Sequence, residues 1–362
     1  MPGQLPIEWR VNNFDLLRLL AALQVALVHA ITFLKPTGYF VHLVAGGLER
    51  FPGLPIFFVV SGLLISMSYE RSDSLREYLR NRCLRIFPGL WVCLAVSVAA
   101  ILALGVSSLG PVAATHWLLW WAAQMSFFQS YQADFFKTLS TGALNGSQWT
   151  IPIELEFYVL LPALYRILQL RSRRGHVPLL AIALGSLSVQ LLLIPAYGFL
   201  RLTVAPYLWM FLVGVAIQRN WRAVRAWLVG RAHWWGLGYV LLCTAARWLR
   251  VEVGGNDISP VYLLPLAGLI VSLAMSVPEL SDRLLRHQDV SYGLYIYHML
   301  VIDLMLGLAV ASGWVALGAA VVASLGVAAV SWTLIEKPFL RRKRGALRAV
   351  SGGSSGAAIS AN

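Results

Sequence analysis

One apolar helix, expected over residues 14 to 30, carries both an arginine and a histidine. Arg18 and His29 are 11 residues apart, so their side chains project within about 20° of each other and about 16 Å apart along one helix face. Ionisable groups are costly at membrane depth, so the pair indicates a reactive site or a pathway. Taken singly, each is equally open to a structural interpretation, with Arg18 snorkelling to the headgroups and His29 satisfied inside a bundle. The stripe between them carries small side chains, at Ala22, Val25 and Ala26.

A second pair of cations lies at the inner end of another expected helix. Arg82 and Arg85 are three residues apart and share a helix face. Two aligned guanidinium groups suit a phosphate ester, because each offers planar, bidentate donors. The alternative, which the residues alone favour, is a basic cluster that contacts anionic lipid. The apolar segment before them contains Ser61 and Gly62, a small pair typical of close helix packing; Ser61 is also a candidate for lining a channel.

A carboxylate is expected near the histidine. The segment SQWTIPIELEFY opens a helix from the outer side, with Pro152 in its first turn and Thr150 as a suitable cap. Glu154 then lies roughly 6 Å deep, and His29 lies roughly 7 Å from the outer end of its own helix. The matched depths predict that Glu154 supports His29 as carboxylates support a general base. The helix dipole also favours acids in a first turn, and we expect one of Glu154 and Glu156 to serve only that role.

A polar stripe marks the helix expected from residue 291. Ser291, Tyr295 and His298 follow helical spacing and share a face that enters from the inner side. Such a stripe on a spanning helix is expected to face the bundle interior. Tyr295 and His298 are therefore candidates for lining a channel, as is Trp149 before the helix of Glu154. Asp303 points about 140° away from His298 and has no assigned role.

The composition is that of an integral membrane protein. The chain has 362 residues, of which 58% are hydrophobic and 12% charged, and its mean hydropathy is +0.69; soluble domains are about half apolar and about a quarter charged. The net charge of +13 does not indicate nucleic-acid binding, because the basic residues cluster between apolar runs. The first apolar run lacks a small-residue cleavage site, so we expect a retained helix. Three cysteines have neither metal nor redox spacing and predict no metal site or disulfide: Cys83, Cys93 and Cys243.

The fold class predicted is all-α, a polytopic bundle of about ten transmembrane helices with both termini cytoplasmic. This orientation places 23 of the 29 Lys and Arg residues on the inner side, as the positive-inside rule requires. An eleventh apolar segment, 115–131, would reverse the later loops if it spanned, and we assign it as re-entrant or interfacial. Residues 1–340 form one domain, and 341–362 are a basic, then Gly/Ser/Ala-rich tail expected to be disordered. The expected spans are 14–34, 54–70, 86–107, 150–169, 178–196, 200–217, 234–250, 260–278, 291–311 and 314–335.

Taken together, these segments resemble the membrane acyltransferase 3 family, bacterial enzymes that modify surface polysaccharides and related acceptors. The resemblance runs from about residue 12 to 340. Each motif alone is weak, and their number and order make the match specific. The segments are FDLLRLLAALQVALVHA, PIFFVVSGLLI, the Arg82 and Arg85 pair, QWTIPIELEFY, SYGLYIYH and the closing EKP.

The resemblance implies transfer of an acyl group, often acetyl, from acyl-coenzyme A at the cytoplasmic face to a hydroxyl of a glycan or glycolipid. It assigns the family's first-helix residues to Arg18 and His29, its RxxR pair to Arg82 and Arg85, and its motif acid to Glu154, with Thr150 replacing the commoner serine. Acyl-CoA is then a donor substrate and no cofactor is bound permanently. The expected location is the bacterial inner membrane, and no oligomeric state is indicated.

Two functions from other classes fit the same composition. A carrier or flippase for a lipid-linked or anionic solute would use Arg18 and His29 as pathway residues. Broken helices in corresponding positions of two halves would favour transport, and the sequence has no convincing pair. A structural subunit of a polysaccharide assembly complex is the third alternative.

Overall fold

The computed structural model is entirely helical over the residues that it describes, which are 9, 12–105, 114–139, 141–170, 172, 175–253, 255–277, 279–286, 288–310 and 313–341. The predicted tail, 341–362, lies outside these residues apart from Arg341. The helices are α1 (Phe14–Leu34), α2 (Tyr39–Glu49), α3 (Gly53–Arg71), α4 (Leu75–Ala103), α5 (Ala114–Gln124), α6 (Thr150–Ile167), α7 (His176–Ser188), α8 (Leu208–Arg219), α9 (Trp221–Leu228), α10 (Ala232–Trp248), α11 (Pro260–Ser276), α12 (Leu280–Leu285), α13 (Ser291–Gly307) and α14 (Gly313–Ser331). Short π-helical turns follow α7 and α14, at Val189–Leu193 and Trp332–Glu336.

The helices form a membrane bundle. Five helical segments are long and apolar enough to cross a bilayer within the described part of the chain: Phe14–Leu34, Tyr39–Arg71, Leu75–Ala103, His176–Leu193 and Gly313–Arg341. The second of these contains both α2 and α3, and the last two each contain a helix and the π-helical turn that follows it. Each of the ten predicted spans coincides at least in part with a helix, while the number that cross the membrane stays a prediction. Within the described residues α5 has 11 residues, about 16 Å of helix, and this part is shorter than a hydrocarbon core of about 30 Å.

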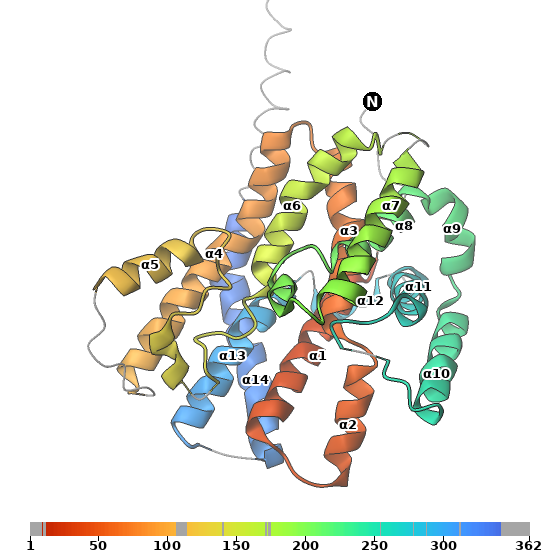
Figure 1. Cartoon of the computed structure of the whole chain (residues 1–362). Helices are drawn as coiled ribbons and strands as arrows, with labels where there is room; N and C mark the ends of the chain where they lie inside the picture. The colour runs from red at the N-terminus through yellow and green to blue at the C-terminus, as the bar shows by residue number, and fades with distance from the viewer. Residues whose placement is uncertain are drawn as a thin grey trace, which may run out of the picture.

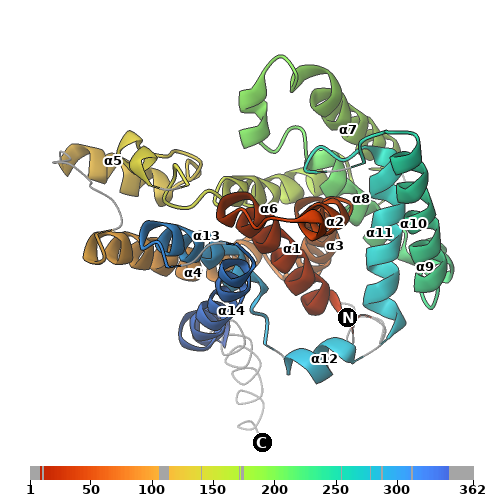
Figure 2. The ribbon, with the colours of Figure 1, turned by 90° about the horizontal axis from the view of Figure 1, so that it is seen from below.

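α1, α3, α6 and α13 lie at the centre of the bundle. Figure 2 shows α10 and α11 at one side of this centre and α5 projecting at the other, and Figure 1 shows α13 and α14 beside α1. Several large side chains of these helices are fully buried, including Phe14, Leu63 and Phe157, and Tyr78 of α4 is buried with them. Most of the residues singled out from the sequence lie on these central helices, whereas Arg82 and Arg85 lie on α4 and Trp149 directly precedes α6.

Glycine permits the close crossing of α3 and α8. A Cβ atom on Gly62 would overlap the carbonyl oxygen of Phe211, and one on Gly214 would overlap the carbonyl oxygen of Val59. Each glycine thus accommodates the backbone of the opposite helix. This contact gives Gly62 the packing role expected of small residues between membrane helices.

We expect Gly62→Ala to destabilise the protein by about 1–3 kcal/mol, the typical cost of overpacking a core. Gly185→Ala in α7 is the matched control, since nothing lies within 4 Å of an added Cβ there. Thermal unfolding of both variants in detergent measures the effect. A melting temperature for Gly62→Ala equal to that of Gly185→Ala would contradict the packing argument.

Candidate active site

The imidazole of His29 is hydrogen-bonded to a second imidazole. Nδ1 of His29 lies 2.8 Å from Nε2 of His298, and the ring planes are 14° apart. His298 is only 1% exposed, and its Nδ1 lies 3.2 Å from the carbonyl oxygen of Leu294. His298 was predicted to line a channel, but it lines neither of the two cavities described below. Its ring instead bridges the His29 ring and the backbone of α13.

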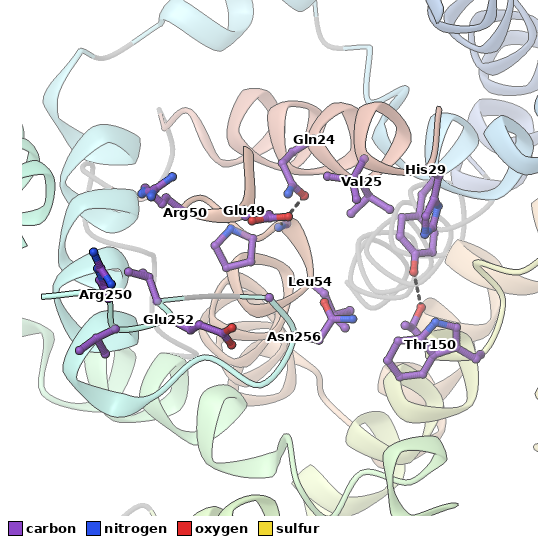
Figure 3. A pocket seen from close by; sticks show the side chains of 18 residues that line it. Gln24, Val25, His29, Glu49, Arg50, Leu54, Thr150, Arg250, Glu252 and Asn256 are labelled. Carbon is purple, nitrogen blue, oxygen red and sulfur yellow. Dashed lines mark hydrogen bonds between the residues drawn. The ribbon is translucent and has the colours of Figure 1, made fainter. Parts of the chain in front are cut away.

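His29 faces a cavity of about 660 Å³. We call it the outer cavity, because the sequence predicts that the His29 end of α1 is the outer end. Figure 3 shows His29 and Thr150 on one side of this cavity and Arg250 and Glu252 on the other. Charged, amide and aromatic groups line it together, including Gln24, Glu49, Arg50, Trp149 and Asn256. A wall of this mixed character can hydrogen-bond a polar molecule and stack against it.

A second, narrow cavity of about 40 Å³ reaches the other end of the α1 stripe. Its walls include Arg18, Ser61 and Glu154. Leu54, Thr150 and Tyr295 line both this inner cavity and the outer one. The Thr150 and Tyr295 hydroxyl oxygens lie 2.6 Å apart in a hydrogen bond. Arg18 and His29 therefore face different cavities, which share three wall residues.

Glu154 lies at the Arg18 end of the site, not at the His29 end as the matched depths predicted. The loop before α6 runs along α13, from near its C-terminal end towards its N-terminal end. The Thr141 hydroxyl donates a hydrogen bond to Asp303, and the Ser147 hydroxyl donates one to the carbonyl of Tyr295. α6 therefore begins level with Tyr295 and deep within the bundle, so one further turn carries Glu154 into the inner cavity. Its carboxylate accepts a 2.5 Å hydrogen bond from the Tyr158 hydroxyl. Glu156 accepts a hydrogen bond from the backbone of Val204.

An acidic residue that the sequence reasoning missed holds two of the arginines. Asp289 Oδ2 lies 2.8 Å from Nη1 of Arg18 and 2.5 Å from Nη2 of Arg85. Glu336, in the π-helical turn, is 3.9 Å from Arg85. Burial alone would raise the pKa of the Asp289 carboxyl, but the charges of Arg18 and Arg85 outweigh burial and hold this pKa well below its ordinary value. The sequence did offer a signal for this residue, because Asp289 lies two positions before Ser291, where the polar stripe of α13 begins.

Removing the Asp289 charge should destabilise the protein strongly. The side chains of Arg18, Arg85 and Asp289 are only 20%, 13% and 11% exposed, and breaking such a buried pair costs about 3–5 kcal/mol. Because the folded pKa of Asp289 is lowered, its contribution is complete above about pH 4 and is lost as pH falls through the lowered value.

We expect Asp289→Asn to lower the melting temperature in detergent at pH 7. Asp257→Asn, which breaks the exposed 2.8 Å pair with Arg201, should have little effect. Equal melting temperatures for the two variants would show that Asp289 is not needed as a counter-ion.

Arg82 differs from its neighbour. It donates to the Ser68 hydroxyl at 3.1 Å and lies over the Tyr158 ring at 5.7 Å from the centroid. Among the described residues no carboxylate lies within ion-pair distance of it, and its Nε has no hydrogen-bond partner there. Of Arg18, Arg82 and Arg85, Arg82 is thus the one whose charge this part of the chain does not neutralise by direct pairing.

Comparison with known proteins identifies the family. A family model described as an acyltransferase domain, Acyl_transf_3, matches residues 11–335. The chain belongs to the acyltransferase 3 family. It is an O-acyltransferase, and its His29 site is the candidate active site of that activity. No solved structure matches the chain significantly.

Relatives of this acyltransferase cover nearly its whole length. Nodulation protein 10 of Rhizobium leguminosarum bv. viciae is 33% identical, over 91% of this chain and 93% of its own. An O-acetyl transferase of Shigella phage Sf6 is 26% identical, over 91% and 96%. The exopolysaccharide production protein ExoZ of Rhizobium meliloti is 26% identical, over 84% and 94%.

Proposed function

We propose that this acyltransferase moves an acyl group, most simply acetyl, from acyl-CoA to a hydroxyl of a glycan or glycolipid in the bacterial inner membrane. The observation that carries the proposal is the arrangement along α1. Arg18 faces the inner cavity and His29 the outer one, and the two cavities meet at Leu54, Thr150 and Tyr295. About 16 Å of helix separates the two residues, comparable with the reach of an extended pantetheine arm.

The donor enters from the cytoplasmic side in this proposal, with its phosphates at the arginine end. Arg82 is the first contact, because no described carboxylate pairs with its guanidinium. Arg18 and Arg85 share Asp289 and retain other donor groups for a phosphate oxygen, since each guanidinium has five N–H groups. The thioester then reaches His29 when the Thr150 to Tyr295 hydrogen bond opens.

The acceptor occupies the outer cavity. Its volume of about 660 Å³ is in the range of small-molecule sites. Trp149 offers an aromatic face, and Glu49, Glu252 and Asn256 offer hydrogen-bonding groups to hydroxyls. The names of the relatives, an O-acetyl transferase and an exopolysaccharide production protein, favour a saccharide.

His29 supplies the chemistry at the junction. As a general base, its Nε2 takes the proton of the acceptor hydroxyl while the oxygen attacks the thioester carbonyl. The carbon–sulfur bond breaks, and the proton passes to the coenzyme A thiolate. The other route forms an acyl-histidine first. Label retained on the protein in the absence of acceptor distinguishes this route from the direct one.

Incubation of the purified protein in lipid vesicles with radiolabelled acetyl-CoA and envelope glycan tests the proposal. Label transferred to the glycan is the expected result. A carrier would leave the glycan unlabelled and would move labelled solute across the vesicle membrane, which would overturn the proposal. If label is transferred to the glycan, mass spectrometry of envelope glycans from cells with and without the gene would identify the acceptor.

A further inference from the structure

We infer that His298 is a positioning residue that fixes the tautomer of His29 and so directs its basic nitrogen into the outer cavity. The inference rests on the proposed role of His29 and adds that His298 determines which nitrogen of the His29 ring carries the hydrogen. The two histidines are 269 residues apart in the chain and meet because α1 packs beside α13. Their hydrogen bond has a direction that the surrounding contacts determine.

The geometry places this hydrogen bond in the plane of both rings. The ring centroids are 5.1 Å apart, the planes differ by 14°, and the nitrogens are 2.8 Å apart. The centroid distance thus exceeds the nitrogen distance by only about one ring radius at each end. The line between the nitrogens therefore passes close to both centroids, as it must when an N–H points at an in-plane lone pair. Face-to-face stacking of the rings would bring the centroids much closer together.

The contact with α13 decides which ring donates. Nδ1 of His298 lies 3.2 Å from the Leu294 carbonyl oxygen, which can only accept, so this nitrogen carries the hydrogen. A neutral imidazole has one N–H, which leaves Nε2 of His298 with a lone pair. A charged His298 would be costly, because the side chain is 1% exposed and no described carboxylate pairs with it. The other titratable ring beside it is Tyr295, with centroids 6.1 Å apart.

The consequence for His29 follows from the same rule. Nδ1 of His29 must donate to Nε2 of His298, so Nε2 of His29 keeps its lone pair. His29 lines the outer cavity while His298 does not, and this Nε2 is the ring nitrogen left without a protein partner in the described chain. When it takes the acceptor proton, the Nδ1–H bond to His298 remains and stabilises the imidazolium. His298 thus performs for His29 the orienting role that a carboxylate performs in a triad.

Two amide variants separate positioning from mere packing. In His298→Gln, the side-chain oxygen can take the place of Nε2 and accept from His29. In His298→Asn, the shorter amide reaches the place of Nδ1, beside Leu294, and not that of Nε2. We expect kcat to fall on the order of a hundredfold or more in His298→Asn and to recover within about tenfold of the native value in His298→Gln. KM for acetyl-CoA should stay unchanged in both.

Equal kcat in the Gln and Asn variants, whether near native or near zero, would overturn the inference. If His29→Ala retains transfer, the proposed function itself fails; if His29→Ala is inactive and both His298 variants are fully active, only the positioning role fails. ¹⁵N NMR of histidine-labelled native protein needs no His298 variant to fold, with His29→Gln used to assign the signal. A protonated Nδ1 and an unprotonated Nε2 on neutral His29 are expected, and the reverse tautomer would refute the inference.

Discussion

Replacing His29 by alanine is expected to reduce acyl transfer by a factor on the order of 10²–10⁴, the usual contribution of a positioned acid or base. The variant loses the nitrogen that faces the outer cavity, whereas the arginine cluster around Asp289 is untouched. Binding of acetyl-CoA should therefore be retained. Initial rates with radiolabelled acetyl-CoA in vesicles, together with donor binding by calorimetry, measure both properties.

His42→Ala is the matched control for that variant. His42 lies on the adjacent helix α2 and is exposed, so its removal should leave the rate unchanged. Near-native transfer by a folded His29→Ala protein would remove the basis for placing the chemistry at this ring. An acyl-histidine route predicts in addition that label is bound covalently to the native protein and is absent from the variant.

The sequence was sufficient to predict the face of α1. Helical geometry alone placed Arg18 and His29 on one side, and in the structure both contact the α13 segment, through Asp289 and His298. Asp289 precedes α13 and meets the early part of α1, while His298 lies farther along α13 and meets the late part. The two helices therefore run parallel, as expected if both enter from the inner side. The polar stripe of α13 was also predictable from helical spacing alone, because Ser291, Tyr295 and His298 share one helix face.

The partners across the bundle could not be predicted. Glu154 and His29 were matched by depth, which assumed that α6 begins at the membrane surface. The loop before α6 instead descends inside the protein, where α13 satisfies its polar groups: Asn145 donates to the carbonyl of Ile296 at 2.6 Å. Such irregular backbone is tolerated at membrane depth when protein surrounds it. Hydropathy does not record that descent, because it reports composition and not the level at which a helix starts.

Arg82 shows why spacing alone does not assign an anion site. Arg82 and Arg85 share a helix face by their separation, yet Arg85 pairs with Asp289 and Arg82 bonds only the Ser68 hydroxyl and an aromatic ring among its described contacts. Two cations with one spacing thus have different charge surroundings. The difference comes from residues more than two hundred positions away in one case and from α3 and α6 in the other, and it makes Arg82 the sharper test of donor binding.

We expect Arg82→Ala to raise the KM for acetyl-CoA about 10- to 100-fold while kcat at saturation is retained. Loss of a hydrogen bond to a charged group costs about 1.5–3 kcal/mol, and a folding penalty should be small because no buried carboxylate loses its partner. Competition of acetyl-CoA binding by coenzyme A, and separately by pantetheine, which lacks the phosphates, locates the contact. Weakened binding of coenzyme A with unchanged binding of pantetheine is expected if Arg82 contacts a phosphate.

Arg80→Ala provides the control for charge alone, since Arg80 is exposed two residues earlier on α4. It removes the same charge from the same end of the bundle, so a general loss of basic surface would raise KM equally in both variants. A contact between Arg82 and the donor predicts a rise only in Arg82→Ala, and this difference should persist at high salt because a partly buried pair is screened less than a surface one. Equal KM values at high salt would assign the basic residues of α4 to lipid contact and not to donor recognition.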